Sequence, residues 1–565
     1  MKLFKEELEN KLSQAVELGS EEIEELLEVP PEPDMGDLAF PCFKLAKIKN
    51  KSPADIALDL ERDINALKSE YFEAVKAVGP YLNVFFSKEK LAEVTIKKVI
   101  DEGERYGSSD EGEGKTVVID FSSPNIAKPF GVGHLRSTVI GNALYNIYEK
   151  LGYEVIGINH LGDWGTQFGK LISAYLKWGD EEKLNEDPID YLYSLYTRYH
   201  QEEEYSPELE EEGREWFRRL ENNDDKAVSL WEKFRELSIE EFKRIYERLG
   251  VSFDSYRGEA YYNKYLDETI SEIEKSEVSR YSEGALVVDL GEEIPPCLLK
   301  KRDGATLYAT RDICAAIKRY EEYQFDKCLY VVGDDQKLHF RQVFETLEKL
   351  GYEFAPLCEH IPFGLIRFKD GKMSTRAGNI IFLEDVLDKA SALALEIIKE
   401  KNPNLENKEE ISEMVGVGAI IFGDLSNDRV KEVTFDWEKI LDFNGETAPY
   451  LQYTHARICS VLKRAEKDRV TKNLNILTGE YEQEVIKKLA NYEENIRRAR
   501  ELNKPHILAR YLLDLARVYN RFYNKCPILN EKEDIKEARL ALCEGVRQVL
   551  KDGLSIMGIK APKAM

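Results

Sequence analysis

The chain has 565 residues, of which 43% are hydrophobic and 33% charged, and its formal net charge is −26. This length predicts three or four domains, and the composition excludes a disordered or fibrous protein. No run of 18 apolar residues occurs and the first residues are charged, which argues against a membrane span or a signal peptide. The eight cysteines form no CxxC pair, so we expect no structural zinc and a cytoplasmic protein.

The charges are unevenly distributed along the chain. Residues 450–526 hold 16 basic and 9 acidic side chains, whereas residues 201–225 hold 3 basic and 11 acidic ones. A local basic surface is enough to bind phosphates, so the acidic total does not exclude a nucleic-acid partner. We therefore expect the C-terminal part to contact RNA, and the sequence gives no role to 201–225.

Residues 1–112 are predicted to form a small α+β module. It begins with apolar residues at helical spacing, followed by a proline-rich loop at 29–34. The alternating segment 80–86 predicts a strand, and the glycine and acidic residues at 107–114 mark a linker.

A βαβ unit opens the second predicted domain. Residues 115–121 form a buried strand, 122–133 a loop with glycine and proline, 135–151 a helix that ends at a glycine, and 153–158 a second strand.

A second strand–helix pair, 327–333 and 338–350, suggests the other half of a doubly wound sheet. The predicted fold is α/β: a Rossmann-type doubly wound catalytic domain over 113–404, with a helical insertion near 170–255. Residues 405–565 show only helical periodicity and are predicted to form an all-α bundle.

The first motif lies between the first strand of this sheet and its helix. Gly131 and Gly133 let the backbone approach a phosphate, and His134 falls where the helix opens and its N–H groups favour anions. The histidine can donate hydrogen bonds to phosphate oxygens as charge builds in a transition state. The plainer interpretation is a glycine-rich turn with a capping histidine.

The second motif is a basic segment at 368–376 that follows a predicted strand at 364–368. Lys372 lies in it with Lys369 and Arg376, and a lysine suits a polyphosphate leaving group. Alone it could equally be a solvated hairpin. In a doubly wound fold the two motifs could meet at one site, because the second follows the second strand–helix pair.

Both motifs resemble those of a known family. The segment 131–134 resembles the HIGH motif of class I aminoacyl-tRNA synthetases, and 372–375 resembles their KMSK motif. The segments 121–130 and 161–168 resemble arginyl-tRNA synthetases in particular, and the resemblance covers essentially the whole chain. It implies ATP-dependent attachment of L-arginine to its tRNA, with Mg²⁺ accompanying ATP, an N-terminal module that contacts the tRNA D-loop and a C-terminal anticodon-binding bundle. It also implies catalytic and ATP-binding roles for Lys128, Gly131, Gly133, His134, Lys372, Met373 and Ser374.

Two positions depart from the family motifs. Gly131 stands in place of the first histidine of HIGH, and Thr375 in place of the second lysine of KMSK. The resemblance implies that Lys128, just before the first motif, compensates for that lysine.

Several residues could recognise a guanidinium, whose planar donors need carboxylates and other acceptors. Tyr308 and Asp312 are spaced i, i+4 and would share one helical face, Glu259 lies in a Tyr-Arg-Gly-Glu segment, and Gln336 follows a strand of the second half. Alone, Asp312 could be a helix cap and Glu259 a surface residue. The resemblance implies that Tyr308, Asp312 and Glu259 face the guanidinium, that Gln336 lines the pocket, and that Ser123 and Asn125 hold the two ends of the amino acid.

The C-terminal part contains an aromatic and arginine face at helical spacing, Tyr450, Tyr453 and Arg457. Unpaired bases stack on such faces, although a tyrosine stripe is as often core. The resemblance implies that these residues read the anticodon with Met565, and that Tyr81 and Asn83 contact the D-loop; a place in a small sheet would explain those two equally well. Arg510, Arg517 and Arg521 form another stripe, which we interpret as a solvated face with incidental phosphate contact.

We expect a cytoplasmic, monomeric arginine–tRNA ligase without membrane contact or a protein-bound metal. Two alternatives stay open: a small-molecule adenylating enzyme of the same superfamily, and a catalytically silent tRNA-binding paralogue. The helical C-terminal part argues against the first, and Lys128, His134 and Lys372 argue against the second.

Overall fold

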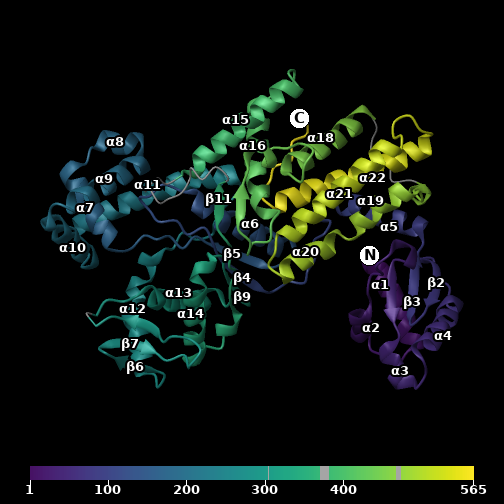
Figure 1. Ribbon diagram of the computed structural model, residues 1–565, viewed down its shortest axis with the longest axis horizontal. Coiled ribbons are helices and arrows are strands. Elements are labelled where there is room, and N and C mark those ends of the chain that lie inside the picture. The colour runs from purple at the N-terminus through teal and green to yellow at the C-terminus, as the bar shows by residue number, and fades with distance from the viewer. Residues whose placement is uncertain (303, 369–380, 466–472) are drawn as a thin grey trace.

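The computed structural model describes residues 1–302, 304–368, 381–465 and 473–565. An N-terminal α+β module lies at one end of the molecule, a parallel sheet at its centre and a helical insertion at the other end (Figure 1). The C-terminal helices lie between the module and the central sheet, along one side of both. The predicted fold class is confirmed. No helix among the described residues is long and apolar enough to cross a membrane.

The N-terminal module is a three-stranded antiparallel sheet covered by helices. The strand order is β1–β3–β2, and the predicted strand at 80–86 is β3. Its elements are α1 (Lys2–Ala15), α2 (Ser20–Leu26), β1 (Leu38–Pro41), α3 (Phe43–Lys49), α4 (Pro53–Ala66), β2 (Phe72–Val78) and β3 (Tyr81–Phe86). The following helix α5 (Lys88–Glu102) packs against the C-terminal helices.

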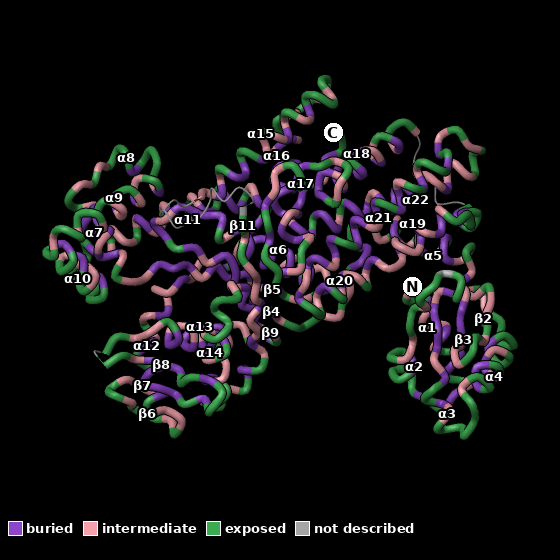
Figure 2. Tube along the Cα trace, viewed as in Figure 1, coloured by how far each residue is buried: buried purple, intermediate pink, exposed green. Residues whose placement is uncertain are grey.

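The central sheet is parallel and doubly wound, as predicted. Its order is β10–β9–β4–β5, and its elements are β4 (Thr116–Asp120), α6 (Leu135–Lys150), β5 (Glu154–Ile158), β9 (Lys327–Tyr330), α14 (Lys337–Lys349) and β10 (Cys358–His360). Alternate residues of β4 enter different cores: Val117 and Ile119 pack with α6, and Val118 packs with α14 and α13 (Tyr308–Tyr323). Figure 2 shows β4 and α6 largely buried.

From β4 the chain continues to β5, its neighbour on one side, and from β9 it continues to β10, which lies on the opposite side of the sheet. The switch in winding direction therefore falls between β4 and β9. Open α/β sheets bind their ligands at such a switch point, outside the carboxyl ends of the strands.

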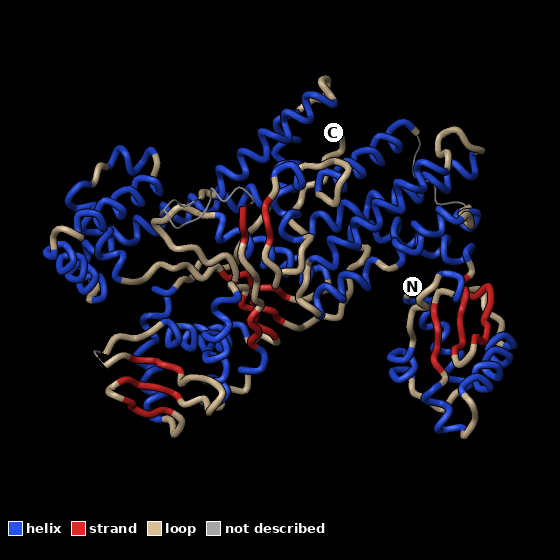
Figure 3. Tube along the Cα trace, viewed as in Figure 1, coloured by secondary structure: helices blue, strands red, loops and turns tan. Residues whose placement is uncertain are grey.

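The predicted helical insertion is present. It consists of α7 (Thr166–Trp178), α8 (Glu181–Glu186), α9 (Pro188–Glu203), α10 (Pro207–Glu221) and α11 (Asp225–Leu249). After it come α12 (Glu259–Lys275) and an antiparallel sheet that was not predicted: β6 (Ser279–Ser282), β7 (Ala285–Val288) and β8 (Cys297–Lys300) (Figure 3). Glu283 and Gly284, both with positive φ, make the two-residue turn between β6 and β7.

Among its described residues, the C-terminal part is helical with one exception. Its helices are α15 (Leu383–Lys401), α16 (Lys408–Leu425), α17 (Trp437–Ile440), α18 (Ala448–Arg464), α19 (Glu480–Ala490), α20 (Tyr492–Glu501), α21 (His506–Lys525) and α22 (Glu533–Ile556). The exception is β12 (Val433–Phe435), which pairs in parallel with β11 (Ile366–Phe368). The prediction of an all-helical segment was wrong at this strand, because three residues are too few to show a period of two.

A buried ion pair joins α6 to α16. Arg136 donates through Nε to Asp424 at 2.7 Å and through another nitrogen to the carbonyls of Gly364 and Lys431 at 2.7 and 2.8 Å. Both side chains of the pair are at most 2% exposed. Arg136 thus ties the helix that His134 opens to the two segments that precede β11 and β12.

Replacing Asp424 with alanine is expected to lower the free energy of unfolding by about 3–5 kcal/mol, since it leaves a buried guanidinium without its counter-charge. Urea unfolding followed by circular dichroism measures this loss. The control is Glu210→Gln, which breaks an exposed pair with Arg214 and should cost less than about 1 kcal/mol. Equal losses in the two variants would contradict a structural role for the buried pair.

Candidate active site

The loop after β4 carries the first motif in a constrained conformation. Ser122, Ser123 and Ala127 all have positive φ, which is uncommon outside glycine. The Ser122 hydroxyl is 2.7 Å from that of Tyr246 on α11, and the Ala127 N–H donates to Ser238 on the same helix at 2.9 Å. The insertion therefore braces this loop.

The residues predicted to hold the ends of the amino acid lie in this loop. Ser123 donates through Oγ to Asp120 at 3.0 Å, and Asp120 forms a buried ion pair with Arg319 on α13 at 2.8 Å. Asn125 is exposed and bridges to Gly162, where any added Cβ would come within 2.0 Å of its side-chain oxygen. Both residues thus lie beyond the carboxyl end of β4.

His134 closes a short 3-10 turn, Val132–His134, and precedes α6 directly. Burial lowers the pKa of His134 below its ordinary value. A hydrogen bond from the ring to the backbone of Ser122 opposes this shift. A neutral imidazole has one N–H donor, so His134 exchanges this bond when it donates to a phosphate oxygen. Gly133 is exposed, and Gly131 has an extended backbone (φ −80°) that other residues can adopt.

Lys128 lies at the boundary between the loop and the insertion. Its ammonium is 5.4 Å from the ring centre of Tyr196 on α9. Burial lowers the pKa of Lys128. A partly desolvated lysine here is available to a nearby phosphate, because no ion pair holds it among the described residues.

The second motif, with Lys372, Met373 and Ser374, lies outside the described residues, but the segment after it meets the first motif. The N–H of Val132 donates to the carbonyl of Ile381 at 3.0 Å, and the N–H of Leu383 to that of Phe130 at 2.8 Å. Gly131 and Phe382 form an antiparallel bridge between them. Backbone hydrogen bonds therefore join the first motif to the residues that follow the second.

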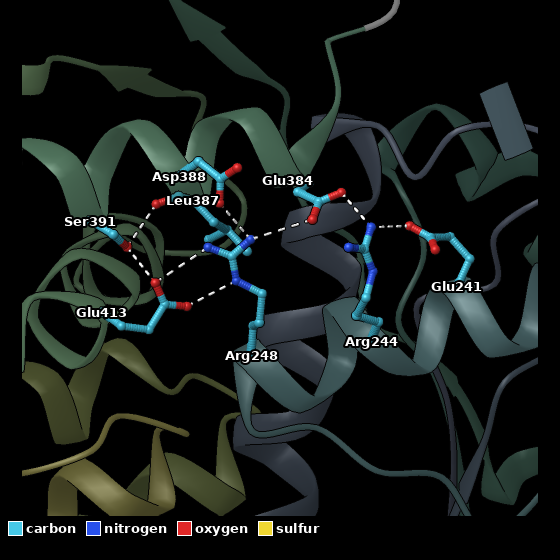
Figure 4. Close-up of polar contacts among 8 residues, drawn as sticks. All are labelled: Glu241, Arg244, Arg248, Glu384, Leu387, Asp388, Ser391 and Glu413. Carbon is cyan, nitrogen blue, oxygen red and sulfur yellow. Dashed lines mark hydrogen bonds and ion pairs between the residues drawn. The ribbon is translucent and has the colours of Figure 1, made fainter. Parts of the chain in front are cut away.

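An ion-pair network fixes α15, which begins at this junction (Figure 4). Arg244 of α11 contacts Glu384 in the first turn of α15 at 2.7 Å. Arg248, one turn further on, contacts Asp388 of α15 at 2.8 Å and Glu413 of α16 at 2.9 Å. The insertion and the first two C-terminal helices, α15 and α16, are thus held together beside the first motif.

Acidic residues gather across the sheet from that motif. Asp312 lies one turn into α13, and its carboxylate is 2.5 Å from the imidazole of His339 on α14. Glu259 begins α12, and burial raises its pKa to about 7, with Asp312 adding to the rise and Arg311 opposing it. These charges influence one another, so the two carboxylates predicted for the guanidinium belong to one region.

The two other residues predicted for this pocket are more exposed. Tyr308 opens α13 and is 68% exposed, one turn before Asp312. Gln336 is exposed in the short 3-10 turn, Asp334–Gln336, just beyond the carboxyl end of β9. Both positions are open to a ligand at the switch point.

Asp163 supports this region and was not assigned a role from the sequence. It is 1% exposed and accepts hydrogen bonds from Arg235 at 3.0 Å and from the N–H of Ala260 at 2.8 Å. A Cβ on Gly258 would come within 2.6 Å of this carboxylate. In the sequence, only the family resemblance over 161–168 indicated a role for Asp163. Its partners lie on α11 and α12, and the hydrophobic pattern of one segment does not show contacts with distant helices.

The pKa of Glu259 predicts how arginine use depends on pH. Below pH 7 the carboxyl is protonated and attracts a guanidinium less, so kcat/KM for arginine should rise roughly tenfold from pH 6 to pH 8. Steady-state kinetics across this range measure the effect. The same rise in Glu259→Gln would assign it to another group.

The three aromatic and arginine positions share one face of α18. Arg457 lies 4.8 Å from the ring centre of Tyr453 and 5.4 Å from that of Tyr523, and donates to Asn520 at 2.9 Å. Asn520 in turn donates to the hydroxyl of Tyr450 at 2.9 Å. Tyr453 is 39% exposed, so this face is only partly core.

The remaining predicted tRNA contacts lie elsewhere. The carbonyl of Met565 accepts from Asn402 at 3.1 Å, and Met565 is half-buried. In the N-terminal module Tyr81 is half-buried against Phe43, whereas Asn83 is 4% exposed. A contact from Asn83 to RNA therefore requires its surroundings to open.

Three family models match the chain. "tRNA synthetases class I (R), catalytic domain" matches residues 95–437, "Arginyl tRNA synthetase N terminal domain" residues 2–86 and "DALR anticodon binding domain" residues 451–565. Together with the doubly wound sheet and the loop at its switch point, the first match defines a class I aminoacyl-tRNA synthetase.

Relatives narrow the class. The arginine–tRNA ligases of Clostridioides difficile and Clostridium perfringens are 50% and 49% identical, with 100% of each chain covered. The arginyl-tRNA synthetase of Thermus thermophilus superposes with a TM-score of 0.83 at 26% identity, again over 100% of both chains. The chain belongs to the arginyl-tRNA synthetase family.

Proposed function

We propose that this protein attaches L-arginine to its cognate tRNA at the expense of ATP. The main support is the pair of interacting carboxylates, Glu259 and Asp312. The N–H of Glu259 donates to Leu161, next to the residue that bridges to the loop after β4. Two carboxylates suit a guanidinium, and a neutral isostere would leave their charges unpaired. Lysine would lose the planar fork of donors.

The reaction has two steps. In the first step, a carboxylate oxygen of arginine attacks the α-phosphorus of ATP. The bond from this phosphorus to the oxygen that bridges to the β-phosphate breaks, so the products are arginyl-adenylate and pyrophosphate. The terminal ribose 2′-hydroxyl of the tRNA then attacks the acyl carbon, AMP departs and the hydroxyl proton is released. Positioning and electrostatic stabilisation carry both steps, so no general base is required.

Each predicted residue has a role in this scheme. His134, Lys128 and Lys372 stabilise the charge on the phosphates, and Gly131, Gly133, Met373 and Ser374 line the ATP site. Ser123 and Asn125 hold the carboxylate and amino groups of arginine, and Tyr308, Gln336 and the two acids hold its side chain. Mg²⁺ bound to the phosphates of ATP would neutralise part of their charge; the described residues contain no cluster of three or more metal-ligating side chains.

We assign the RNA contacts by region. The residues on α18 with Met565 read the anticodon, and Tyr81 and Asn83 in the N-terminal module contact the D-loop. We propose a monomer in the cytoplasm, a setting that suits the eight free cysteines.

ATP–pyrophosphate exchange with each of the twenty amino acids, with and without total tRNA, tests the proposal. We expect exchange only with arginine and only with tRNA, because the family resemblance implies that activation requires bound tRNA. Exchange that never needs tRNA, with no transfer to RNA, would favour a small-molecule adenylating enzyme. No exchange with intact RNA binding would favour a silent paralogue.

A further inference from the structure

A polar pocket of about 360 Å³ lies between α20 and α21, apart from the site described above. We refer to it as the α20–α21 pocket. Its lining includes Lys488, Asn491, Asn495, Arg498, Lys504, His506, Arg510 and Asp514. It falls within the region matched by the anticodon-binding family model.

Two arginines give this pocket an uncompensated positive charge. Arg498 and Arg510 are exposed and form no ion pair among the described residues. The acid in the lining is already neutralised, because Asp514 contacts Lys488 at 3.3 Å and Arg517 at 3.2 Å. An anion in the pocket would therefore meet two unopposed guanidinium groups.

A buried histidine points to a ligand independently. His506 is 8% exposed, lines the pocket, and its Nδ1 has no hydrogen-bond partner among the described residues. An unpaired buried polar atom is costly, and a phosphate oxygen or a sugar hydroxyl could satisfy it.

The turn between α20 and α21, which carries the lining residue Lys504, is fixed to the catalytic domain. Asn503, in the turn between α20 and α21, is 2% exposed and accepts from the Tyr148 hydroxyl of α6 at 2.9 Å. It donates to Glu359 at 3.1 Å, and its carbonyl accepts from Arg429 at 2.9 Å. The pocket is thus formed before any ligand arrives, which lowers the entropy cost of binding.

The pocket is distinct from the anticodon face. His506 and Arg510 lie at the start of α21, whereas Asn520 and Tyr523, which contact Arg457, lie about 15–25 Å further along at 1.5 Å per residue. One nucleotide cannot occupy both. We propose that the α20–α21 pocket binds a backbone phosphate of the tRNA outside the anticodon; the inference rests on the proposed function for its ligand.

The test compares two double variants in the full-length protein. Arg498→Ala/Arg510→Ala removes the unpaired cations. Arg214→Ala/Arg218→Ala is the control, since both arginines are exposed on α10 and paired, Arg214 with Glu210 and Arg218 with Glu211 and Glu215. The dissociation constant of tRNA is measured by filter binding at several salt concentrations.

We expect the first variant to weaken tRNA binding roughly 10- to 100-fold near 0.1 M salt and to lower the log–log salt slope by about 0.7–0.9 per lost contact. The control should change binding less than about threefold. Unchanged binding in the first variant, or equal losses in both, would overturn the proposal. Inorganic phosphate is the second probe. Suppose that phosphate raises the melting temperature of the wild type but not of the Arg498→Ala/Arg510→Ala variant, and that the variant binds tRNA as tightly as the wild type. The pocket then binds free anions, and the assignment to tRNA is wrong.

Charging assays separate this inference from the proposed function. At saturating tRNA the first variant should retain kcat for arginylation, because the pocket is remote from the reacting atoms. A wild-type protein that binds tRNA but attaches no arginine to it would refute the proposed function. The comparison of tRNA binding between the two variants would still show whether the pocket binds tRNA.

Discussion

Replacing Asp312 with asparagine is expected to raise the KM for arginine and lower kcat/KM by roughly 30-fold to several thousand-fold. This range corresponds to the roughly 2–5 kcal/mol lost when one partner of a buried charge pair is removed. The side chain keeps its shape, so the change isolates the charge beside His339 and Glu259. Exchange kinetics with varied arginine measure the effect.

Glu321→Gln on the same helix is the matched control. Glu321 is exposed and pairs with Lys318 three residues away, at 2.9 Å. Its removal should leave the KM for arginine unchanged. If Asp312→Asn and Glu321→Gln behaved alike, the guanidinium would have to bind elsewhere.

Replacing His134 with alanine is expected to lower kcat for exchange about 100- to 1000-fold, the usual cost of removing one donor to a developing anion. The KM for arginine should change little, because no arginine contact is removed. Single-turnover formation of the adenylate measures the step directly. His134→Gln keeps a donor and should recover part of the rate.

The control for this change is Asn146→Ala. Asn146 lies on the same helix, about three turns after His134, and donates to the carbonyl of Ile556 at 2.9 Å. Normal exchange in His134→Ala, with the melting temperature of the wild type, would mean that the histidine only caps its helix. A drop in both variants would indicate a folding defect.

The sequence predicted the parts of this fold that have a strong local signal. The strand β4 is a run of apolar residues between turn signals, and α6 carries apolar residues on one face before Gly152. Their order along the chain implied a parallel sheet, and the sheet implied where the loops would meet. Some short strands escaped this reasoning: β12 has three residues and β6–β8 four each, although the equally short β9 and β11 were predicted.

The site residues, like the strands, were predictable only where the sequence around them has a strong local signal. Residues in a motif, such as His134, could be located from the sequence, because a glycine-rich loop before a helix has a physical reason to bind phosphate. Asp163 could not, since its partners lie on α11 and α12. The stripe of Arg510, Arg517 and Arg521 shows most clearly what the sequence pattern cannot predict. Helical spacing gives the three arginines the same interpretation, whereas the structure shows that Arg517 and Arg521 form ion pairs and Arg510 forms none among the described residues.

The three left-handed residues of the loop after β4 have a consequence for thermal adaptation. A non-glycine residue in that conformation is disfavoured by roughly 1–2 kcal/mol. Ser122, Ser123 and Ala127 therefore lower the free energy of unfolding, and the contacts of the surrounding fold must offset this strain. Glycine would relieve the backbone at these positions but would also let the loop sample many shapes. Selection for heat resistance and selection for turnover therefore pull these positions in opposite directions, and stabilising changes should accumulate far from this loop.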